Sequence, residues 1–545
     1  MRQTTTHDDR KIHLVSIPDG LSDGDDRRDL GKVLDALSWC VPGYVEDLIG
    51  KTKVKWLVAD TNMGALCFEV AKKLGVRVAS FFPASAACLG TLFRVPKLIE
   101  DGFFDDKGFP KRRGEFELAP KMPPIYTSHM VWSVEGGPEV QHAAFQLVCR
   151  NNQASSLAEV VVCNSFLEAE ATAFELFPNI LPIGPLFADQ RKPVGQFLPE
   201  DTRCLSWLDG HPDNSVVYVA FGTSTVFDPR QFKDLAEGLE LTGRPFLWVV
   251  RPDFTSGAGV SKAWFDEFES RVAGRGMVVS WCSQQQVLAH RAVACFVSHC
   301  GWNSTMEGVR NVVPFLCWSR LKVDQYANRS YVCDIWRTGL AVSPVEDGVV
   351  TKEEVSAKVE QVIGDHGIAD RARMLGDAAR SSLGEGGSSY GNFNRFIGLL
   401  MENPNKEIFS ELDEINAQHL RIPRSFQNTR EPPEEGHRGP TRVGGAAKEP
   451  GAPPYCVVAP SAFRLRLFAY LKLPDLNLRD GKATVRKTFQ SRRHREAKIW
   501  GTGVSVPARR RDGEVPPEGI SIDTTAIFTA IAVSYDEEGV VLHRG

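Results

Sequence analysis

Short apolar runs alternate with longer amphipathic stretches over residues 10–402. Runs of about four to eight residues rich in β-branched and aromatic side chains predict strands, and apolar positions three and four apart predict helices. This alternation is typical of α/β folds with parallel sheets. In the first part of the chain the predicted strands are residues 12–18, 54–60, 77–83 and 160–165, with a helix at 64–74.

A second series of strand-like runs follows, and its almost continuous apolar character predicts strands covered on both faces. These runs are residues 215–223, 246–251, 277–281, 295–299, 313–318 and 339–343. Between the two series, a segment rich in Pro, Gly and charge reads as a linker. The pattern therefore predicts an α/β domain at 1–185, a linker at 186–204 and a second domain at 205–402.

Two signals mark the end of the second domain. Thr351 can cap a helix, with Glu354 three residues later and Val355, Val359 and Val362 on one face. A last helical pattern ends near residue 400. Beyond it, Pro and Gly clusters break any periodicity, and residues 421–512 contain 20 Lys and Arg against 8 Asp and Glu. Such a segment cannot offset its chain entropy by burial, so residues 403–545 are predicted to be mostly disordered.

The composition argues against several classes of function. The chain has 545 residues and a net charge of −4, which gives no global electrostatic argument for nucleic acid or an anionic membrane as partner. Its 12 cysteines show no CxxC pairs, so neither a zinc site nor a disulfide framework is indicated. The sequence shows no apolar stretch of about 18 residues and no signal-peptide pattern. We therefore expect a cytoplasmic monomer that binds no metal and does not span a membrane.

The candidate chemistry lies between residues 281 and 325. Trp281 follows a predicted strand and so lies at the carboxyl edge of a sheet, where open α/β folds bind ligands and an indole can stack on a base. Residues 299–304 are a strand end, a glycine turn and a helix start, which direct backbone N–H groups toward an anion. Glu307 follows one turn later, where it could accept hydrogen bonds from ribose hydroxyls. The pattern predicts a nucleotide site.

Each of these residues alone has a plainer interpretation. A lone Trp is more often part of a core, Asn303-Ser304 is more often a helix cap, and a His at a strand end such as His299 is usually structural. Their combined spacing is what favours a nucleotide.

At this level of detail the segment closely resembles the plant secondary-product glycosyltransferase box, the signature of family-1 UDP-glycosyltransferases. Similar blocks extend from about residue 10 to residue 402, namely IHLVSIPDG, CNSFLE, LPIGPL, SVVYVAFGT, FLWVVR and EGGSSYGN. The resemblance implies the GT-B fold, in which two Rossmann-like domains face each other. It also implies UDP-sugar on the second domain and an acceptor mostly on the first.

The resemblance further implies which residues form the UDP-sugar site. They are Thr223, Trp281, Cys282, Gln284, His299, Gly301, Trp302, Asn303, Ser304, Glu307, Asp324 and Gln325. Trp281 would stack on uracil, with backbone groups of Cys282 and Gln284 at the edge of the base. The diphosphate would lie at the turn of Gly301, held by His299, Asn303, Ser304 and the loop of Thr223. Glu307 would bind ribose, and Trp302, Asp324 and Gln325 would face the sugar, with glucose as the usual donor.

Two departures from the family pattern concern this site. The segment from Trp318 to Gln325 spans eight residues where the family has seven, so Asp324 and Gln325 are expected to be displaced by one residue from the sugar. In addition, Asn311-Val312-Val313 replaces the usual Asn-Gly-Val, which is expected to strain that turn.

Family members transfer sugar with inversion, using a His as general base and an Asp that orients it. Asp60 ends the Val-Ala-Asp run and matches that Asp, although it could instead be a helix N-cap. No partner can be assigned, because His7 lies in a polar leader and His13 lies inside a predicted strand. The first strand of the fold and the base are therefore expected to be missing, which would expose a sheet edge.

The expected function is that of an inverting O-glycosyltransferase that uses UDP-glucose and a small lipophilic plant metabolite. UDP-sugar is then a co-substrate, and no cofactor or metal is implied. The alternative is a catalytically inactive UDP-sugar-binding remnant that lacks the base. A weaker third hypothesis is nucleic-acid binding through the basic run at residues 492–495.

Overall fold

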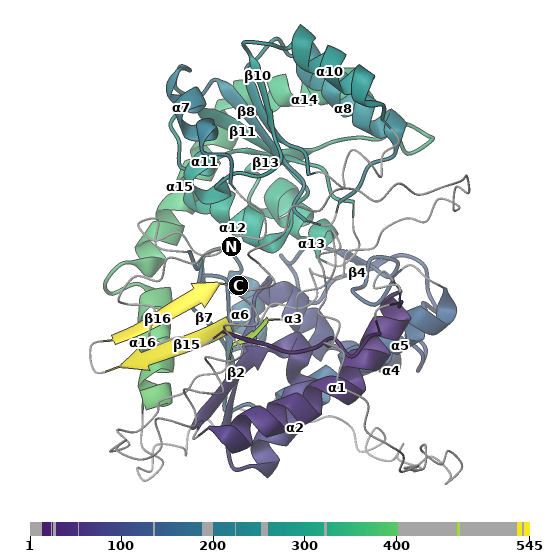
Figure 1. Cartoon of the computed structure of the whole chain (residues 1–545), viewed down its shortest axis with the longest axis vertical. Helices are drawn as coiled ribbons and strands as arrows, with labels where there is room; N and C mark the ends of the chain where they lie inside the picture. The colour runs from purple at the N-terminus through teal and green to yellow at the C-terminus, as the bar shows by residue number, and fades with distance from the viewer. Residues whose placement is uncertain are drawn as a thin grey trace, which may run out of the picture.

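Two parallel sheets, each covered by helices, form two lobes that face each other (Figure 1). The computed structural model describes residues 14–22, 24–25, 29–52, 54–134, 137–187, 200–223, 225–251, 260–320, 324–401, 466–468, 531–536 and 539–544. His7 and His13 lie outside the described residues.

The first lobe contains a four-stranded parallel sheet with strand order β2-β3-β6-β7. Its strands are β2 (Trp56–Asp60), β3 (Arg77–Phe82), β6 (Val160–Cys163) and β7 (Ile180–Pro182). Its helices are α1 (Leu30–Lys51), α2 (Gly64–Lys73), α3 (Ala86–Phe93), α4 (Val95–Glu100), α5 (Pro138–Ser155) and α6 (Ala171–Leu176), with a short hairpin of β4 (Glu115–Phe116) and β5 (Ile125–Tyr126). The predicted strands at 54–60, 77–83 and 160–165 and the helix at 64–74 are confirmed.

The second lobe contains a six-stranded parallel sheet with strand order β10-β9-β8-β11-β12-β13. Its strands are β8 (Val216–Ala220), β9 (Phe246–Val249), β10 (Gly276–Val279), β11 (Val293–Ser298), β12 (Phe315–Cys317) and β13 (Gly339–Ala341). Its helices are α7 (Arg203–Asp209), α8 (Pro229–Leu241), α10 (Lys262–Arg271), α11 (Gln284–Leu288), α12 (Trp302–Arg310), α13 (Gln325–Ser330), α14 (Lys352–Gly364) and α15 (His366–Leu383). All six predicted strands are present, and every residue of β8 and β11 is buried.

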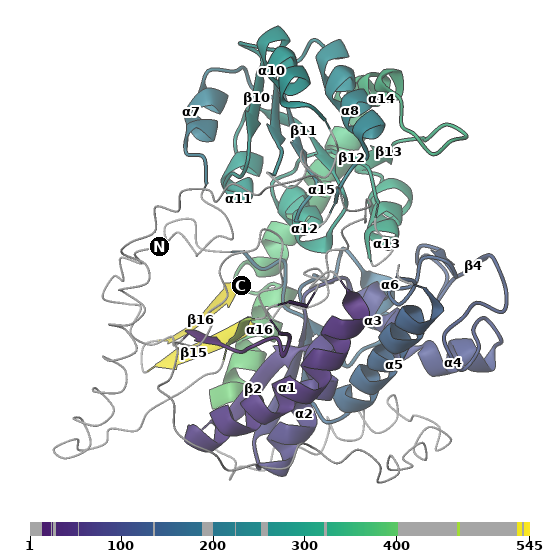
Figure 2. The same cartoon turned by 45° about the vertical axis from the view of Figure 1, so that its right-hand side comes forward.

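The last helix of the second series, α16 (Ser388–Met401), crosses back to the first lobe. Phe396 of α16 is buried against one face of the four-stranded sheet, in a cluster with Trp56, Phe81 and Val162. The opposite face is covered by α1, α2 and α5 (Figure 2). Residues 388–401 therefore pack with the first lobe, although the sequence groups them with the second. The domain bounds 1–185, 186–204, 205–402 and 403–545 stay predictions.

The predicted helix start at Thr351 is confirmed. The Thr351 hydroxyl accepts a hydrogen bond from the Glu354 backbone N–H at 3.3 Å. The Glu354 carboxylate does not complete a reciprocal capping box but accepts from the Ser343 N–H at 2.8 Å. The cap therefore also fixes the end of β13 to the start of α14.

The N-terminal strand does not join the parallel sheet. Residues 12–18 were expected to be a strand of the first parallel series, but β1 (Leu14–Ser16) pairs antiparallel with β14 (Arg466–Phe468), so that expectation is wrong. A short apolar run indicates a strand without specifying its partner or direction. The described C-terminal residues also include the hairpin of β15 (Ile531–Asp536) and β16 (Gly539–Arg544), which lies close to β2. Most of the segment predicted to be disordered lies outside the described residues.

No helix within the described part of the chain is long and apolar enough to cross a membrane.

The turn between α12 and β12 contains the strain expected from its sequence. Val312 has φ 63°, in the left-handed region where a β-branched side chain is unfavourable. Its Cγ2 atom lies against α15, where a Cβ added to Gly376 would come within 2.7 Å of it. Packing against α15 thus holds a residue in a conformation that glycine would adopt without cost.

Replacing Val312 with Gly should raise the free energy of unfolding by about 1 kcal/mol, because relief of left-handed strain exceeds the entropy that glycine adds to the unfolded chain. Denaturant unfolding measures the change. The control is Val313→Gly, at a buried neighbour whose φ is not positive, and it should lower stability. A Val312→Gly protein less stable than wild type would contradict the prediction and show that the packing lost with the Val312 side chain outweighs the strain relieved.

Candidate nucleotide-sugar site

The predicted site residues lie at the carboxyl edge of the six-stranded sheet, on the side that faces the first lobe. The loops after β8, β10, β11 and β12 supply them, and α12 and α13 begin there (Figure 2). Parallel strands bring their carboxyl ends to one edge, so residues far apart in the sequence meet at this crevice. We consider the base end of the site first, and then the phosphate and sugar ends.

The base end is built around Trp281, which is half-buried just after β10. Its carbonyl accepts a hydrogen bond from the Asp201 N–H at 2.9 Å. Its indole N–H is buried and has no hydrogen-bond partner among the described residues. The adjacent Cys282 is buried, with its Sγ 3.5 Å from the Tyr218 hydroxyl. The backbone of this loop is thus held firmly, while stacking of Trp281 on a base stays a prediction.

A hydrogen-bond network joins three of the predicted site residues, Gln284, Ser304 and Glu307. The Gln284 side-chain NH₂ donates to the Ser304 hydroxyl at 2.9 Å and to the Glu307 carboxylate at 2.7 Å. Its oxygen accepts from the Tyr218 hydroxyl at 3.1 Å, and Gln285 donates to the second Glu307 oxygen at 3.1 Å. Glu307 is only 4% exposed. A buried carboxylate oriented by amide donors is suited to accept further hydrogen bonds from hydroxyl groups.

Sequence reasoning missed part of this network. It assigned only backbone groups of Gln284 to the site, whereas the side chain is what links α11 to α12. It did not single out Gln285 or Tyr218 at all. The polar Gln284-Gln285-Gln286 run directly after the strand could have been a signal, since buried carboxylates need donors nearby.

The phosphate end is built around His299, at the end of β11. Two glycines leave room for its ring, because a Cβ on Gly222 or Gly301 would lie 2.6 or 2.5 Å from Nε2. Burial and the positive charge of Arg251 lower the pKa of His299 to about 4. The imidazole is therefore neutral near pH 7, where it can offer one N–H donor.

Arg251 was not recognised from the sequence, although it ends the FLWVVR block. It is 5% exposed, and its guanidinium donates to the carbonyls of Gly222 and, at 3.1 Å, Thr225. These bonds fix the loop after β8, in which Gly222 has φ 65° and Thr223 is exposed. Arg251 thereby shapes the loop that carries Thr223 toward the crevice.

At the sugar end, Trp302 contacts the first lobe. The Trp302 indole is 2% exposed, and its N–H donates to the Asn164 carbonyl of the first lobe at 2.7 Å. The indole N–H of Trp302 is therefore committed to the contact between the lobes, and the contact of Trp302 with the sugar stays a prediction. A tryptophan buries a large area and also needs a partner for its N–H, so a lobe interface satisfies both demands.

Asp324 and Gln325 lie at the start of α13. The Asp324 carboxylate accepts from the Asn328 side chain at 2.9 Å and from the Trp302 backbone N–H, while burial raises the pKa of Asp324. The Gln325 side-chain oxygen accepts from the Arg320 N–H at 3.0 Å. Residues 321–323, inside the lengthened segment, lie outside the described residues. Both side chains are thus held by local hydrogen bonds, and their role toward a sugar stays a prediction.

Asp60 ends β2, on the first lobe, and is 1% exposed. Its carboxylate accepts from the Asn62 backbone N–H at 2.8 Å and from the Asn62 side chain at 3.0 Å, capping the short helix at Thr61–Met63. Asp60 is therefore an N-cap, but of this short helix and not of the predicted helix at 64–74, whose N-cap in the structure is Met63. Its role as the partner of a catalytic His is not tested, since both candidate histidines lie outside the described residues.

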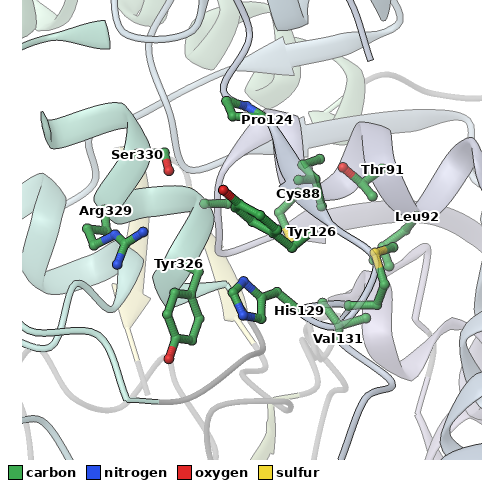
Figure 3. Close-up of a pocket in the computed structure, with 13 residues that line it drawn as sticks. Cys88, Thr91, Leu92, Pro124, Tyr126, His129, Val131, Tyr326, Arg329 and Ser330 are labelled. Atoms are coloured by element: carbon green, nitrogen blue, oxygen red, sulfur yellow. The ribbon is translucent and has the colours of Figure 1, made fainter. Parts of the chain in front are cut away.

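A pocket lies between the two lobes, next to the sugar end (Figure 3). It is lined by α3, by residues 124–131 and by α13, and the rings of His129 and Tyr326 stack across it at 4.0 Å between centroids. The negative charge of Asp324 adds to burial in raising the pKa of Cys88, which lines this pocket. Tyr326 and Ala327, which follow Asp324 in the chain, line the pocket, so it lies near Asp324. No local sequence pattern predicts this pocket, because its walls come from segments more than 190 residues apart, Tyr126–His129 and Tyr326–Arg329.

Comparison with known proteins agrees with this geometry. UDP-glycosyltransferase 83A1 of Arabidopsis thaliana is 38% identical over 410 residues, covering 72% of this chain and 85% of the relative. A family model described as UDP-glucoronosyl and UDP-glucosyl transferase matches residues 142–376. The chain belongs to the plant family-1 UDP-glycosyltransferases.

Other members of the family are similar over most of their length. Myricetin 3-O-rhamnoside 1,2-glucosyltransferase UGT709G2 of Crocosmia x crocosmiiflora is 31% identical, covering 71% of this chain and 84% of the relative. The structure of Phytolacca americana UGT2 with UDP-2fluoro-glucose and pterostilbene aligns with a TM-score of 0.58 and 27% identity, over 71% of this chain and 85% of that one. Os79 of O. sativa in complex with UDP aligns with a TM-score of 0.59 and 27% identity, over 71% and 88%. The fold of this glycosyltransferase is GT-B, as the resemblance implied.

One buried carboxylate of this glycosyltransferase, missed by the sequence analysis, positions the pocket. Glu170 lies just beyond the CNSFLE block and is 2% exposed. It accepts from the N–H groups of Ala86 and Ala87 at 2.8 and 2.9 Å and from the Ser165 hydroxyl at 2.6 Å. It thus holds the N-terminus of α3, which lines the pocket.

Replacing Glu170 with Gln should destabilise the first lobe by about 1–3 kcal/mol, because the amide NH₂ cannot accept from a buried backbone N–H, whereas both carboxyl oxygens of Glu170 keep acceptor capacity even when the group is protonated. The deficit should depend on pH. Burial raises the pKa of Glu170 to about 7, so its contribution to wild-type stability is greatest below its unfolded pKa and is lost as pH rises through 7. Since Gln does not titrate, the difference between the two proteins should shrink by up to about 3 kcal/mol from pH 5 to pH 8.

Denaturant unfolding at both pH values measures this difference. The matched control is Glu168→Gln, at an exposed neighbour, which should match wild type at each pH. A Glu170→Gln deficit that stays constant or widens toward pH 8 would contradict the assignment.

Proposed function

We propose that this chain transfers glucose from UDP-glucose, with inversion, to a hydroxyl group of a small lipophilic plant metabolite. The observation that carries the proposal is the network of Gln284, Ser304 and Glu307 at the carboxyl edge of the six-stranded sheet. It provides the buried, oriented carboxylate that a ribose needs, beside a helix start suited to a diphosphate. A relative binds UDP-2fluoro-glucose together with pterostilbene, which supports both substrate classes.

In this proposal the base of UDP stacks on Trp281, and the ribose hydroxyls donate to Glu307. The diphosphate accepts hydrogen bonds at the start of α12 from Asn303 and Ser304, and from the neutral ring of His299. The loop of Thr223 closes the site from the other side. Asp324 and Gln325 are proposed to contact the glucose hydroxyls, with no cofactor or metal required. Monomeric state and cytoplasmic location also stay predictions.

We place the acceptor in the pocket between α3, residues 124–131 and α13. Its walls are largely apolar or aromatic, and its lining residues include Leu92, Met130, Tyr126 and Tyr326. Such a lining suits a small molecule with an aromatic or terpenoid body. Its position beside Asp324 brings an acceptor hydroxyl close to the proposed donor sugar.

The presence or absence of a catalytic base decides between an active transferase and an inactive UDP-sugar-binding protein. An inverting transfer needs a base that removes the proton of the attacking hydroxyl. In the active hypothesis Asp60 orients that base. The second candidate function is UDP-sugar binding without turnover, and the observation favouring it is that Asp60 already caps the helix at Thr61–Met63.

The test uses the full-length chain. Calorimetry measures UDP and UDP-glucose binding, and a coupled assay measures UDP release with a panel of phenolic and terpenoid alcohols. Acceptor-dependent UDP release supports the transferase. Binding without turnover supports the inactive protein, and absence of nucleotide binding would overturn both.

Replacing Trp281 with Ala should weaken UDP binding by about tenfold or more, because stacking of an aromatic ring on a base contributes about 1–3 kcal/mol. Calorimetry with UDP measures the change. Trp264→Ala is the control, since Trp264 lies on α10, stacks on Phe268 at 5.7 Å and should not affect UDP affinity. Unchanged affinity in Trp281→Ala would rule out the stacking arrangement.

A further inference from the structure

The two lobes meet at Asn164, directly after β6. This residue is 4% exposed and contacts α12 of the other lobe twice. Its backbone carbonyl accepts from the Trp302 indole at 2.7 Å, and its side-chain NH₂ donates to the Asn303 side-chain oxygen at 3.1 Å. Asn303 is one of the residues proposed to hold the diphosphate, so the first lobe contacts the phosphate end of the site.

The orientation of both amide groups follows from the hydrogen-bond network. The Leu186 backbone N–H donates to the Asn164 side-chain oxygen at 2.8 Å, and a backbone N–H can only donate. The oxygen of Asn164 must therefore face Leu186, and its NH₂ must face Asn303. Since that NH₂ can only donate, the oxygen of Asn303 must point toward Asn164, which directs the NH₂ of Asn303 to the other side.

The turn at Gly184, next to Asn164, is tightly packed. The Gly184 N–H donates to the Ser165 carbonyl at 2.8 Å. A Cβ on Gly184 would lie 2.7 Å from the Asn164 side-chain oxygen and from the Ser165 nitrogen. The end of the first lobe, in the LPIGPL block, is thus pressed against Asn164, and its amide has little freedom to turn over.

We propose that Asn164 is a positioning residue for the donor: it holds Asn303 so that the amide NH₂, and not the carbonyl, faces the diphosphate. This inference rests on the proposed function, because it assumes a diphosphate at the start of α12. A UDP-sugar diphosphate at neutral pH accepts hydrogen bonds and donates none, so a reversed Asn303 would place a carbonyl oxygen against an anion. The consequence is that full affinity for the phosphates requires the first lobe to be in contact with α12.

The test variant is Asn164→Asp in the full-length chain. The carboxylate still accepts from the Leu186 N–H, but its second oxygen faces the Asn303 oxygen and so favours reversal of that amide. At about pH 7.5 we expect UDP affinity to fall by about tenfold or more, the size of a lost hydrogen bond to a charged group. Uridine, which has the base and ribose but no phosphate, should bind within about twofold of its wild-type affinity.

The matched control is Asn392→Asp. Asn392, on α16, donates to the Pro182 carbonyl at 3.0 Å, close to the same turn but without contact to Asn303. It should leave UDP and uridine affinities unchanged. Uridine binding also reports that each variant is folded at the site.

A pH series adds a measurement that a merely structural role would not move. When the carboxyl group of Asn164→Asp is protonated, its O–H can donate to the Asn303 oxygen and restore the original arrangement. The ratio of mutant to wild-type UDP dissociation constants should therefore fall toward one between about pH 7.5 and pH 4.5. Dividing the mutant dissociation constant by the wild-type one cancels any effect of pH on UDP affinity that both proteins share.

Each outcome separates this inference from the proposed function. If wild type fails to bind UDP, the proposed function is wrong, and the positioning role of Asn164 is overturned with it. If wild type binds UDP but Asn164→Asp binds it within about twofold, or loses uridine affinity equally, only the positioning role is overturned. A ratio of mutant to wild-type UDP dissociation constants that is large and constant across the pH series would also contradict the positioning role of Asn164.

Discussion

The rest of this structure depends on one geometric constraint: parallel strands that share a sheet end at the same edge. In the second lobe this brings the loops after β8, β10, β11 and β12 together, although they are spread over more than 100 residues of sequence, from Phe221 to Asp324. The polar groups at these ends would each be costly to bury alone. Together they satisfy one another, as the bonds among Gln284, Ser304 and Glu307 show. The polar groups at this edge thus form the candidate site and also supply one another's hydrogen-bond partners.

The junction between the lobes follows a similar logic. Two indoles of the second lobe donate to carbonyls of the first, Trp302 to Asn164 at 2.7 Å and Trp336 to Ala169 at 2.8 Å. Each contact combines a large apolar surface with one directional bond, which fixes the distance and the rotation between the lobes. Because Trp302 is the first residue of α12, this contact sets the position of the helix that is proposed to hold the diphosphate.

The six strands of the second sheet, three of the four strands of the first sheet and the edge at which the candidate residues meet could be predicted because their signals are local, whereas β7 was missed. Continuous apolar runs identified β8 and β11, and the Thr351–Glu354 spacing identified the start of α14. What could not be predicted depends on contacts between distant segments. Glu170 holds α3 across 83 residues of sequence, and Asn164 reaches Asn303 across 139. Similarly, the antiparallel pairing of β1 with β14 involves a partner that no local pattern of β1 can specify.

The path of α16 has a consequence for the order of folding. The chain passes from the first lobe to the second through the segment between Leu186 and Arg203, and returns through the short turn before Ser388. Phe396 and Asn392 then anchor the returning helix to the sheet and to the carbonyl of Pro182. Because α16 follows the second lobe in the chain but packs on the sheet of the first, this part of the first lobe can be completed only after the second lobe has been synthesised.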